Sequence, residues 1–321
     1  MRIVFTGTGD IGIPTLSALL SLKNCQVVAV ICQPDKPVGR KQILTPPATK
    51  TLALAHGIPV HQPPKLRLAH DLVASLQADL MVVIAYGQIL PQHILDLPRL
   101  GCINLHASLL PLHRGAAPIQ AAILSGNPLS GITVMQMDAG LDSGDIIHQE
   151  SLPLTPDETG GSLHDRLATL APVALLAALP SIFDGSATRT PQNAAASSHI
   201  GKLSRADGLL DWSLPASSLE RRIRAFDPWP GTTTTLPDGS QLKIFPPVAP
   251  LDIPTGCPIP GTILHAGPDG ISVACGSGAL TIHQLQSEGR RRLDASAFLS
   301  GNPLSPGDIL GIPKPSPPSE S

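Results

Sequence analysis

Two polar side chains share one face of a short predicted strand near the middle of the chain. The segment 101–107, GCINLHA, is largely apolar, and its Asn104 and His106 are two positions apart. Because successive side chains of a strand point to opposite faces, both should converge on one pocket. Such a pair can donate hydrogen bonds and move a proton. A buried Asn and His are each costly without a partner, so a functional or networked role is favoured, although alone such a pair is more often structural.

A second candidate for chemistry is the glycine pattern near the start of the chain. Gly7, Gly9 and Gly12 form a complete GxGxxG after a predicted strand and before a predicted helix, which is typical of a dinucleotide-binding turn. An NAD-binding half also needs an acidic residue at the end of the second strand. That strand is followed here by Gln33 and proline. The pattern therefore favours a tight strand-to-helix turn over an NAD site.

Composition excludes several classes of protein. The chain has 321 residues, 42% hydrophobic and 14% charged, so it is globular and long enough for two domains. Its 22 Lys and Arg against 24 Asp and Glu give a net charge of −2, so a nucleic-acid partner must be bound by local patches. The five cysteines form no CxxC pair. We therefore expect neither a disulfide scaffold nor a metal site.

No segment of the sequence favours a signal peptide or a membrane span. The first residues, MRIVFTGTGD, are predicted to be a strand that runs directly into the glycine turn. The stretch 167–183 is uncharged and reaches the lower limit for a membrane span, but it contains Pro172 and Pro180. We expect a helix packed on a sheet, no membrane partner and a cytoplasmic protein.

Hydrophobic patterns predict alternating strands and helices in the first half of the chain. Apolar, β-branched runs predict strands at 3–6, 27–32, 80–86 and 101–107. Amphipathic patterns predict helices at 15–22, 48–55, 69–76 and 118–126. The fully apolar strands are typical of a parallel sheet that helices cover on both faces. A hairpin-like pair of strands is predicted at 131–138 and 145–154, around a turn at 139–144.

The pattern changes in the second half. Residues 188–206 lose apolar periodicity and are predicted to be an interdomain linker. One amphipathic helix around 217–225 and then short strands between Gly, Pro and Asp turns predict a small β-barrel or sandwich over 207–312. The last residues, 313–321, are too polar and proline-rich to be buried, and we expect a disordered tail.

Several longer motifs resemble one family. The segments NLHASLLPLHRGAAPIQ (104–120) and MDAGLDSGDII (137–147) resemble the folate-dependent formyltransferases. Three further segments are similar to the members of that family whose acceptor is methionyl-tRNA: QPDKPVGR (33–40), KLSRADGLLDWS (202–213) and RIRAFDPWPG (222–231). The resemblance extends from Met1 to about Leu310. It implies an α/β architecture, with a Rossmann-like catalytic domain over 1–187 and an OB-like tRNA-binding barrel over 207–312.

The resemblance also implies a reaction and a catalytic triad. The reaction moves the formyl group of 10-formyltetrahydrofolate to the α-amino group of initiator methionyl-tRNA, without a metal. Asn104, His106 and Asp142 would be catalytic. Asn104 could donate to the tetrahedral oxyanion, His106 could help to move protons, and Asp142 could orient His106. Read without the resemblance, Asp142 is an ordinary turn aspartate.

Binding residues follow from the same resemblance. Ser108, Leu109, Leu110 and Pro111 would form the loop that accommodates the folate, with Val82–Tyr86 and Met135–Asp138 as further walls. The alternative is a loop that only packs on the sheet. Arg40 would approach the acceptor end of the tRNA, although a lone arginine is usually solvated surface. We expect the protein to act as a monomer.

Three alternative functions remain open at the level of sequence. A formyltransferase with the same folate donor could use an aminoribonucleotide or an amino sugar as its acceptor. An NAD-dependent oxidoreductase could use the glycine turn. A non-enzymatic tRNA-binding module would keep the second domain and would not need Asn104, His106 and Asp142.

Overall fold

The computed structural model describes residues 1–39, 41–253 and 258–311. The chain divides into two compact units, each built from segments that are distant in sequence. The first unit, which we call the catalytic unit, comprises 1–122, 128–154 and 163–202. The second comprises 123–127, 155–162 and the chain from 203 onward.

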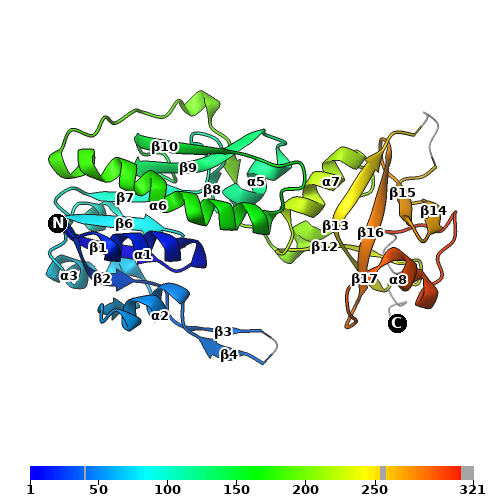
Figure 1. Ribbon diagram of the computed structural model, residues 1–321, viewed down its shortest axis with the longest axis horizontal. Helices are drawn as coiled ribbons and strands as arrows, with labels where there is room; N and C mark the ends of the chain where they lie inside the picture. The colour runs from blue at the N-terminus through cyan, green and yellow to red at the C-terminus, as the bar shows by residue number, and fades with distance from the viewer. Residues whose placement is uncertain (40, 254–257, 312–321) are drawn as a thin grey trace, which may run out of the picture. The chain divides into compact units, whose positions relative to one another are not determined.

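A seven-stranded sheet forms the centre of the catalytic unit (Figure 1). Its order is β10-β9-β7-β6-β1-β2-β5. The strands are β1 (Arg2–Gly7), β2 (Gln26–Ile31), β5 (Val60–His61), β6 (Leu80–Ile84), β7 (Cys102–His106), β9 (Leu129–Gln136) and β10 (Ile146–Pro153). The five strands β5, β2, β1, β6 and β7 run parallel, and the apolar runs predicted all of them except β5. β9 is antiparallel to both β7 and β10, so the predicted strand pair after β7 is confirmed.

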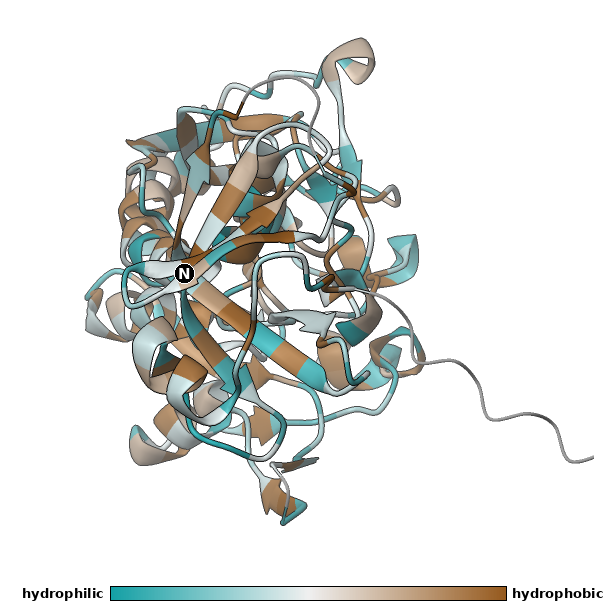
Figure 2. Cartoon of the chain, turned by 90° about the vertical axis from the view of Figure 1, so that its right-hand side faces the viewer, coloured by the Kyte–Doolittle hydropathy of each residue, from teal (hydrophilic) through white to brown (hydrophobic). Residues whose placement is uncertain are grey.

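Helices lie between these strands in the sequence, and a last helix follows β10. They are α1 (Ile13–Ser21), α2 (Ala48–Ala55), α3 (His70–Ser75), α4 (Gln92–Leu95), α5 (Pro118–Leu124) and α6 (Gly160–Asp184). All five residues of β6 are buried, and Figure 2 shows stretches of hydrophobic residues, in brown, along the strands. The predicted α/β alternation is therefore confirmed. The short edge strand β5 and the helix α4 were not predicted from the sequence.

Helix α6 contains the uncharged stretch 167–183, with both prolines inside the helix. By length and composition it could cross a membrane. Its buried residues recur every three or four positions, as on a helix that packs by one side: Leu163, Leu167, Ala171, Ala174, Leu175, Ala178, Leu179 and Ile182. His164 Nε2 lies 3.2 Å from Asp10 Oδ1, which connects α6 to the glycine turn.

Two small two-stranded pairings complete the catalytic unit. β3 (Lys36–Val38) and β4 (Ile43–Thr45) form an antiparallel hairpin whose strand residues are all exposed. β8 (Arg114–Gly115) pairs in parallel with β11 (His199–Ile200). The second pairing draws part of the predicted linker, 188–206, onto the catalytic unit.

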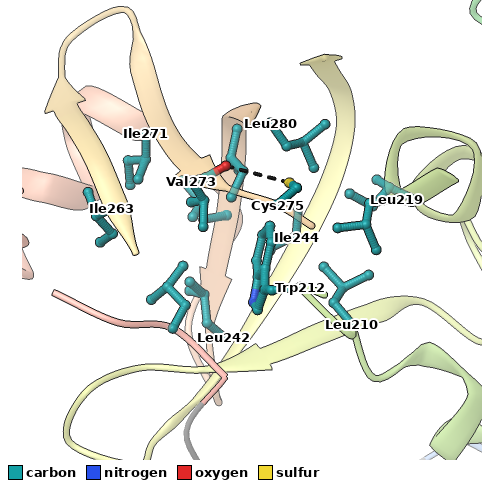
Figure 3. Packing of buried hydrophobic residues seen from close by; sticks show 14 of the residues in the cluster. Leu210, Trp212, Leu219, Leu242, Ile244, Ile263, Ile271, Val273, Cys275 and Leu280 are labelled. Carbon is teal, nitrogen blue, oxygen red and sulfur yellow. Dashed lines mark hydrogen bonds between the residues drawn. The ribbon is translucent and has the colours of Figure 1, made fainter. Parts of the chain in front are cut away.

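The second unit contains an antiparallel sheet with the order β12-β13-β16-β15-β14, and β17 pairs with β16. Its strands are β12 (Thr232–Thr235), β13 (Gln241–Leu251), β14 (Ile263–Gly267), β15 (Gly270–Ala274), β16 (Ala279–Ser287) and β17 (Leu293–Asp294). Two helices accompany them, the expected α7 (Ala216–Ala225) and the unexpected α8 (Ala295–Gly301). Figure 3 shows the apolar core around Trp212. The indole Nε1 of Trp212 donates to Thr234 Oγ1 at 2.9 Å. The tail predicted at 313–321 lies outside the described residues.

Candidate active site

Strand β7 positions the two polar residues that the sequence singled out. It lies between β6 and β9, and Asn104 pairs with Val83 on one side and Met135 on the other. His106 is buried, with 5% of its surface exposed, whereas Asn104 is half-buried. Within the described part of the chain, the side-chain amide of Asn104 has no hydrogen-bond partner. Its donor and acceptor are therefore available to a ligand.

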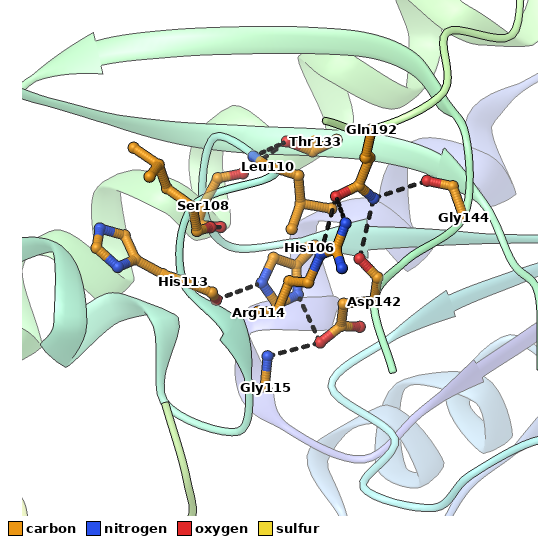
Figure 4. Close-up of polar contacts among 11 residues, drawn as sticks. His106, Ser108, Leu110, His113, Arg114, Gly115, Thr133, Asp142, Gly144 and Gln192 are labelled. Atoms are coloured by element: carbon orange, nitrogen blue, oxygen red, sulfur yellow. Dashed lines mark hydrogen bonds and ion pairs between the residues drawn. The ribbon is translucent and has the colours of Figure 1, made fainter. Parts of the chain in front are cut away.

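The backbone fixes which nitrogen of His106 carries the permanent proton. His106 Nε2 lies 3.0 Å from the carbonyl oxygen of His113. A carbonyl can only accept, so Nε2 donates and keeps its hydrogen. Nδ1 lies 3.7 Å from Asp142 Oδ2. Proton exchange by His106 is thus confined to Nδ1, the nitrogen beside the carboxylate (Figure 4).

Asp142 reaches His106 because its loop turns back along the sheet. After β9, Met137 N donates to Cys102 O at 2.8 Å, near the start of β7. Asp142 nevertheless lies beside His106 at the other end of that strand. Its backbone is left-handed, with φ +52°, and its Oδ2 accepts from Gly115 N at 2.8 Å. The structure therefore brings Asp142 and His106 together, as the resemblance implied.

Gly144 allows the close approach of this loop to β9. A Cβ at this position would lie 1.7 Å from Gln136 O, so no larger residue fits without displacing the strand or the loop. The sequence predicted a turn at 139–144, which contains the two glycines Gly140 and Gly144. Only the tertiary contact explains why the second of them must be glycine.

The loop 108–111 is held by hydrogen bonds to neighbouring strands. Ser108 is fully buried, and its hydroxyl donates to Leu112 O at 2.6 Å. Thr133 Oγ1 donates to Ser108 O at 2.6 Å and accepts from Leu110 N at 3.0 Å. Gln149 Nε2 donates to Leu110 O at 2.9 Å. These polar groups are therefore engaged within the protein, and they fix the loop beside His106.

Other parts of the loop remain more open. Leu109 is half-buried, whereas Leu110 is buried with 3% of its surface exposed. The Leu110–Pro111 peptide bond is cis. The expectation that Ser108, Leu109, Leu110 and Pro111 contact the folate stays a prediction. Leu109 and Pro111 are both half-buried, so these two apolar side chains are the ones of the loop that a ligand can reach, whereas Ser108 has a structural role.

The segment 82–86, which was expected to form a wall of the folate site, ends in a buried tyrosine. Tyr86 is 2% exposed, and its hydroxyl has no hydrogen-bond partner among the residues described. Burial raises the pKa of Tyr86 to about 12, so the phenol stays protonated at neutral pH. The wall is therefore uncharged at Tyr86.

The glycine turn is occupied by the protein itself. Thr8 N and Gly9 N donate to Ala85 O at 3.2 and 3.4 Å, and Thr8 Oγ1 accepts from Gln33 N at 3.1 Å. In a dinucleotide-binding turn, such amides would face the pyrophosphate. Here they connect β1 to the loop after β6. This observation favours the structural interpretation of the turn over the oxidoreductase.

Three contributors to the site were not predicted from sequence. They are the carbonyl of His113, the amide of Gly115 and the side chain of Gln192. Because nearly every residue carries the same main-chain N–H and C=O groups, the residue types do not show which of these groups contact the site. Gln192 lies in the low-complexity segment 188–206, where spacing carried no indication of a contact with the site.

Two further expectations concern Arg40 and metals. Arg40 lies outside the described residues, between β3 and β4 of the exposed hairpin. In the part of the chain that the structure covers, no three His, Cys, Asp or Glu side chains cluster in a way that could hold a metal ion.

Comparisons with known proteins identify relatives along both units. A family model described as formyl transferase matches residues 1–179, and one described as formyl transferase, C-terminal domain, matches 202–303. A methionyl-tRNA formyltransferase of Geobacter metallireducens is 48% identical over 314 residues, which cover 97% of this chain and 99% of the relative. One of Pseudomonas putida is 50% identical over 295 residues, covering 91% of this chain and 93% of the relative.

Solved structures share the fold at lower identity. The sugar 3N-formyl transferase WlaRD, whose crystals contained dTDP and 5-N-formyl-THF, has a TM-score of 0.64 and 16% identity. The match covers 91% of this chain and 99% of that protein. At this identity the likeness concerns the fold.

Proposed function

The chain belongs to the formyl transferase family, and from that premise we propose that Asn104, His106 and Asp142 are the catalytic residues of an enzyme that formylates initiator methionyl-tRNA. The formyl donor is 10-formyltetrahydrofolate. The observation that carries the choice of acceptor is the 48–50% identity, over nearly the full length, with methionyl-tRNA formyltransferases.

The proposed reaction is a direct acyl transfer. The lone pair of the methionine α-amino group forms a bond to the formyl carbon, and the bond from that carbon to N10 of the folate breaks. The amine loses one proton, and N10 gains one. No covalent enzyme intermediate is needed, because an amine attacks a correctly held formamide directly. The protein therefore contributes positioning and electrostatic stabilisation.

Each catalytic residue has a role that its contacts support. The unpartnered amide of Asn104 donates to the formyl oxygen as negative charge develops there. His106 exchanges its proton at Nδ1, because its Nε2–H is held by His113 O. Asp142, 3.7 Å from that nitrogen, orients the ring and stabilises its charged form, and it helps to take the proton from the attacking amine.

Substrate binding extends beyond the triad. We propose that the folate lies against the loop 108–111, chiefly against the half-buried Leu109 and Pro111, and that Arg40 meets the acceptor end of the tRNA. With a net charge of −2, the chain has to bind tRNA through local basic groups, and Arg40 follows in sequence an exposed strand, Lys36–Val38, that could present such a group. The relatives are bacterial translation enzymes, so we expect a cytoplasmic protein, and we propose that it acts as a monomer.

The alternatives have less support. The sugar formyltransferase shares only the fold, at 16% identity, so an amino-sugar acceptor is not favoured. The turn amides that an NAD enzyme would use are bonded to Ala85 O. A non-enzymatic module would not require an imidazole and a carboxylate to be brought together from β7 and from a loop that turns back along it.

The decisive experiment follows a labelled formyl group. The purified protein is incubated with formyl-labelled 10-formyltetrahydrofolate and with charged initiator or elongator methionyl-tRNA. We expect label on the initiator tRNA and much less on the elongator tRNA. Label on neither would overturn the proposal, and label on an amino sugar alone would favour the alternative acceptor.

A further inference from the structure

Gln192 connects a buried arginine to the loop that carries Asp142. Its Oε1 accepts from Arg114 Nε at 3.0 Å and from Arg114 Nη2 at 2.7 Å. Its Nε2 donates to Asp142 O at 2.9 Å and to Gly144 O at 2.7 Å. One amide side chain thus makes four hydrogen bonds, all within the catalytic unit (Figure 4).

The partners determine the orientation of this amide. A guanidinium only donates and carbonyls only accept, so Oε1 must face Arg114 and Nε2 must face the loop. Arg114 is 8% exposed, and no carboxylate lies within ion-pair distance of it in the described structure. Its charge therefore polarises the amide of Gln192 and strengthens the two hydrogen bonds to the loop.

The loop needs this external support. Asp142 has φ +52°, a left-handed conformation that residues other than glycine adopt only where their surroundings hold them in it. Gly115 N holds its side chain, whereas Gln192 holds its backbone carbonyl. On the other side of the loop, Gly144 is in close contact with β9. Release of the two carbonyls would free Asp142 to leave the conformation that turns its carboxylate toward His106.

We propose that Gln192 is a positioning residue, which Arg114 holds in place and which keeps Asp142 in its catalytic conformation. The proposal rests on the proposed function of Asp142. It assigns a role in the reaction to a residue of the segment 188–206, which the sequence indicated as a linker. Gln192 acts only through the loop, so its contribution should disappear when Asp142 no longer contributes.

The variant Gln192→Glu separates the contact with Arg114 from the contact with the loop. It keeps an acceptor for Arg114 and replaces the donors to Asp142 O and Gly144 O with a carboxylate oxygen that repels them. We expect kcat for methionyl-tRNA formylation to fall about 10- to 100-fold, the range for misplaced catalytic groups, with little change in KM for tRNA. Gln192→Ala takes its place if the glutamate variant does not fold. The control is Asn193→Ala, since that neighbouring side chain bonds only to Ala195 N.

A double-mutant cycle tests whether Gln192 acts through Asp142. Added to Asp142→Asn, the Gln192 substitution should lower kcat less than threefold further. A full additional 10-fold loss, or wild-type kcat in the single variant, would overturn the proposal. The wild-type protein run in parallel reports on the proposed function separately, because absence of formylation there concerns the reaction and not Gln192.

A measurement independent of activity completes the test. Hydrogen exchange of a peptide covering 138–145 should become at least 10-fold faster in Gln192→Glu and should stay unchanged in Asn193→Ala. Unchanged exchange in the glutamate variant would show that the loop does not depend on Gln192, and it would overturn the proposal whatever the activity.

Discussion

Asn104 offers a half-buried amide that no described residue engages, next to the buried His106 on the same strand. A donor of this kind contributes mainly when charge develops on the formyl oxygen. Asn104→Ala should therefore lower kcat by about 10²- to 10³-fold, with little change in folate binding. Steady-state kinetics and donor binding without tRNA measure the two effects. Activity within threefold of wild type would remove Asn104 from the mechanism.

Asp142 combines a geometric and an electrostatic role, and one substitution separates them. Asparagine tolerates a left-handed backbone and can still accept from Gly115 N, so Asp142→Asn keeps the loop in place but removes the charge beside His106 Nδ1. We expect kcat to fall by about 10²-fold or more. Steady-state kinetics with methionyl-tRNA measure this loss. Full activity in this variant would make Asp142 a turn residue only.

At the scale of elements, the β3–β4 hairpin has a fixed base and exposed strands. Lys50 Nζ lies 2.9 Å from Asp35 Oδ2, and Lys36 Nζ donates to Gln33 Oε1 at 2.6 Å. The side chains of Val38, Ile43 and Leu44 are 56%, 62% and 64% exposed. Six exposed strand residues do not stabilise a core. The hairpin is therefore suited to meeting a partner, which agrees with the proposed role of Arg40.

Arg40→Leu tests this role of the hairpin. If the guanidinium binds the tRNA backbone, its loss should reduce kcat/KM for methionyl-tRNA. The reduction should correspond to about 1–3 kcal/mol of lost transition-state stabilisation, the strength of a charge-assisted hydrogen bond. Folate binding without tRNA should be unaffected. The dependence of tRNA binding on salt should become shallower by about one phosphate contact. The control is Arg67→Leu, an exposed arginine elsewhere in the catalytic unit. Equal losses in the two variants would make Arg40 ordinary surface.

At the scale of the whole molecule, burial of a site residue makes the stability of the fold depend on pH. Burial, together with nearby His106, lowers the pKa of His113 below its ordinary value of 6.5. The unfolded chain therefore binds this proton at a higher pH than the folded chain does. Below about pH 6.5 the unfolded state holds more protons, so the free energy of unfolding decreases as the pH falls through that region.

His113→Asn should reduce this dependence. Asparagine does not titrate and suits the left-handed backbone at this position, where φ is +60°. The drop in Tm between pH 7.5 and pH 5.5 should be smaller in the variant than in the wild type, as measured by thermal unfolding in matched buffers. His56→Asn, at an exposed histidine, is the comparison. Equal drops in the His113 variant and the wild type would show that His113 does not contribute.

Much of this protein was determined by the sequence alone. The apolar runs predicted the parallel strands β1, β2, β6 and β7, because strands covered on both faces carry few polar residues. The period of two placed Asn104 and His106 on one face of β7. The longer motifs then indicated the family, which the matches over 1–179 and 202–303 confirm.

The tertiary structure alone decided how the site is held together. The proton position on His106 depends on the His113 carbonyl, and the conformation of Asp142 depends on Gly115 N and Gln192. Main-chain donors and acceptors are the same at every residue, so a sequence does not show which of them meet. Gln192 is 50 residues from Asp142 and 78 from Arg114, and no local periodicity relates such positions. These contacts arise only when the segment 188–202 folds back onto the catalytic unit.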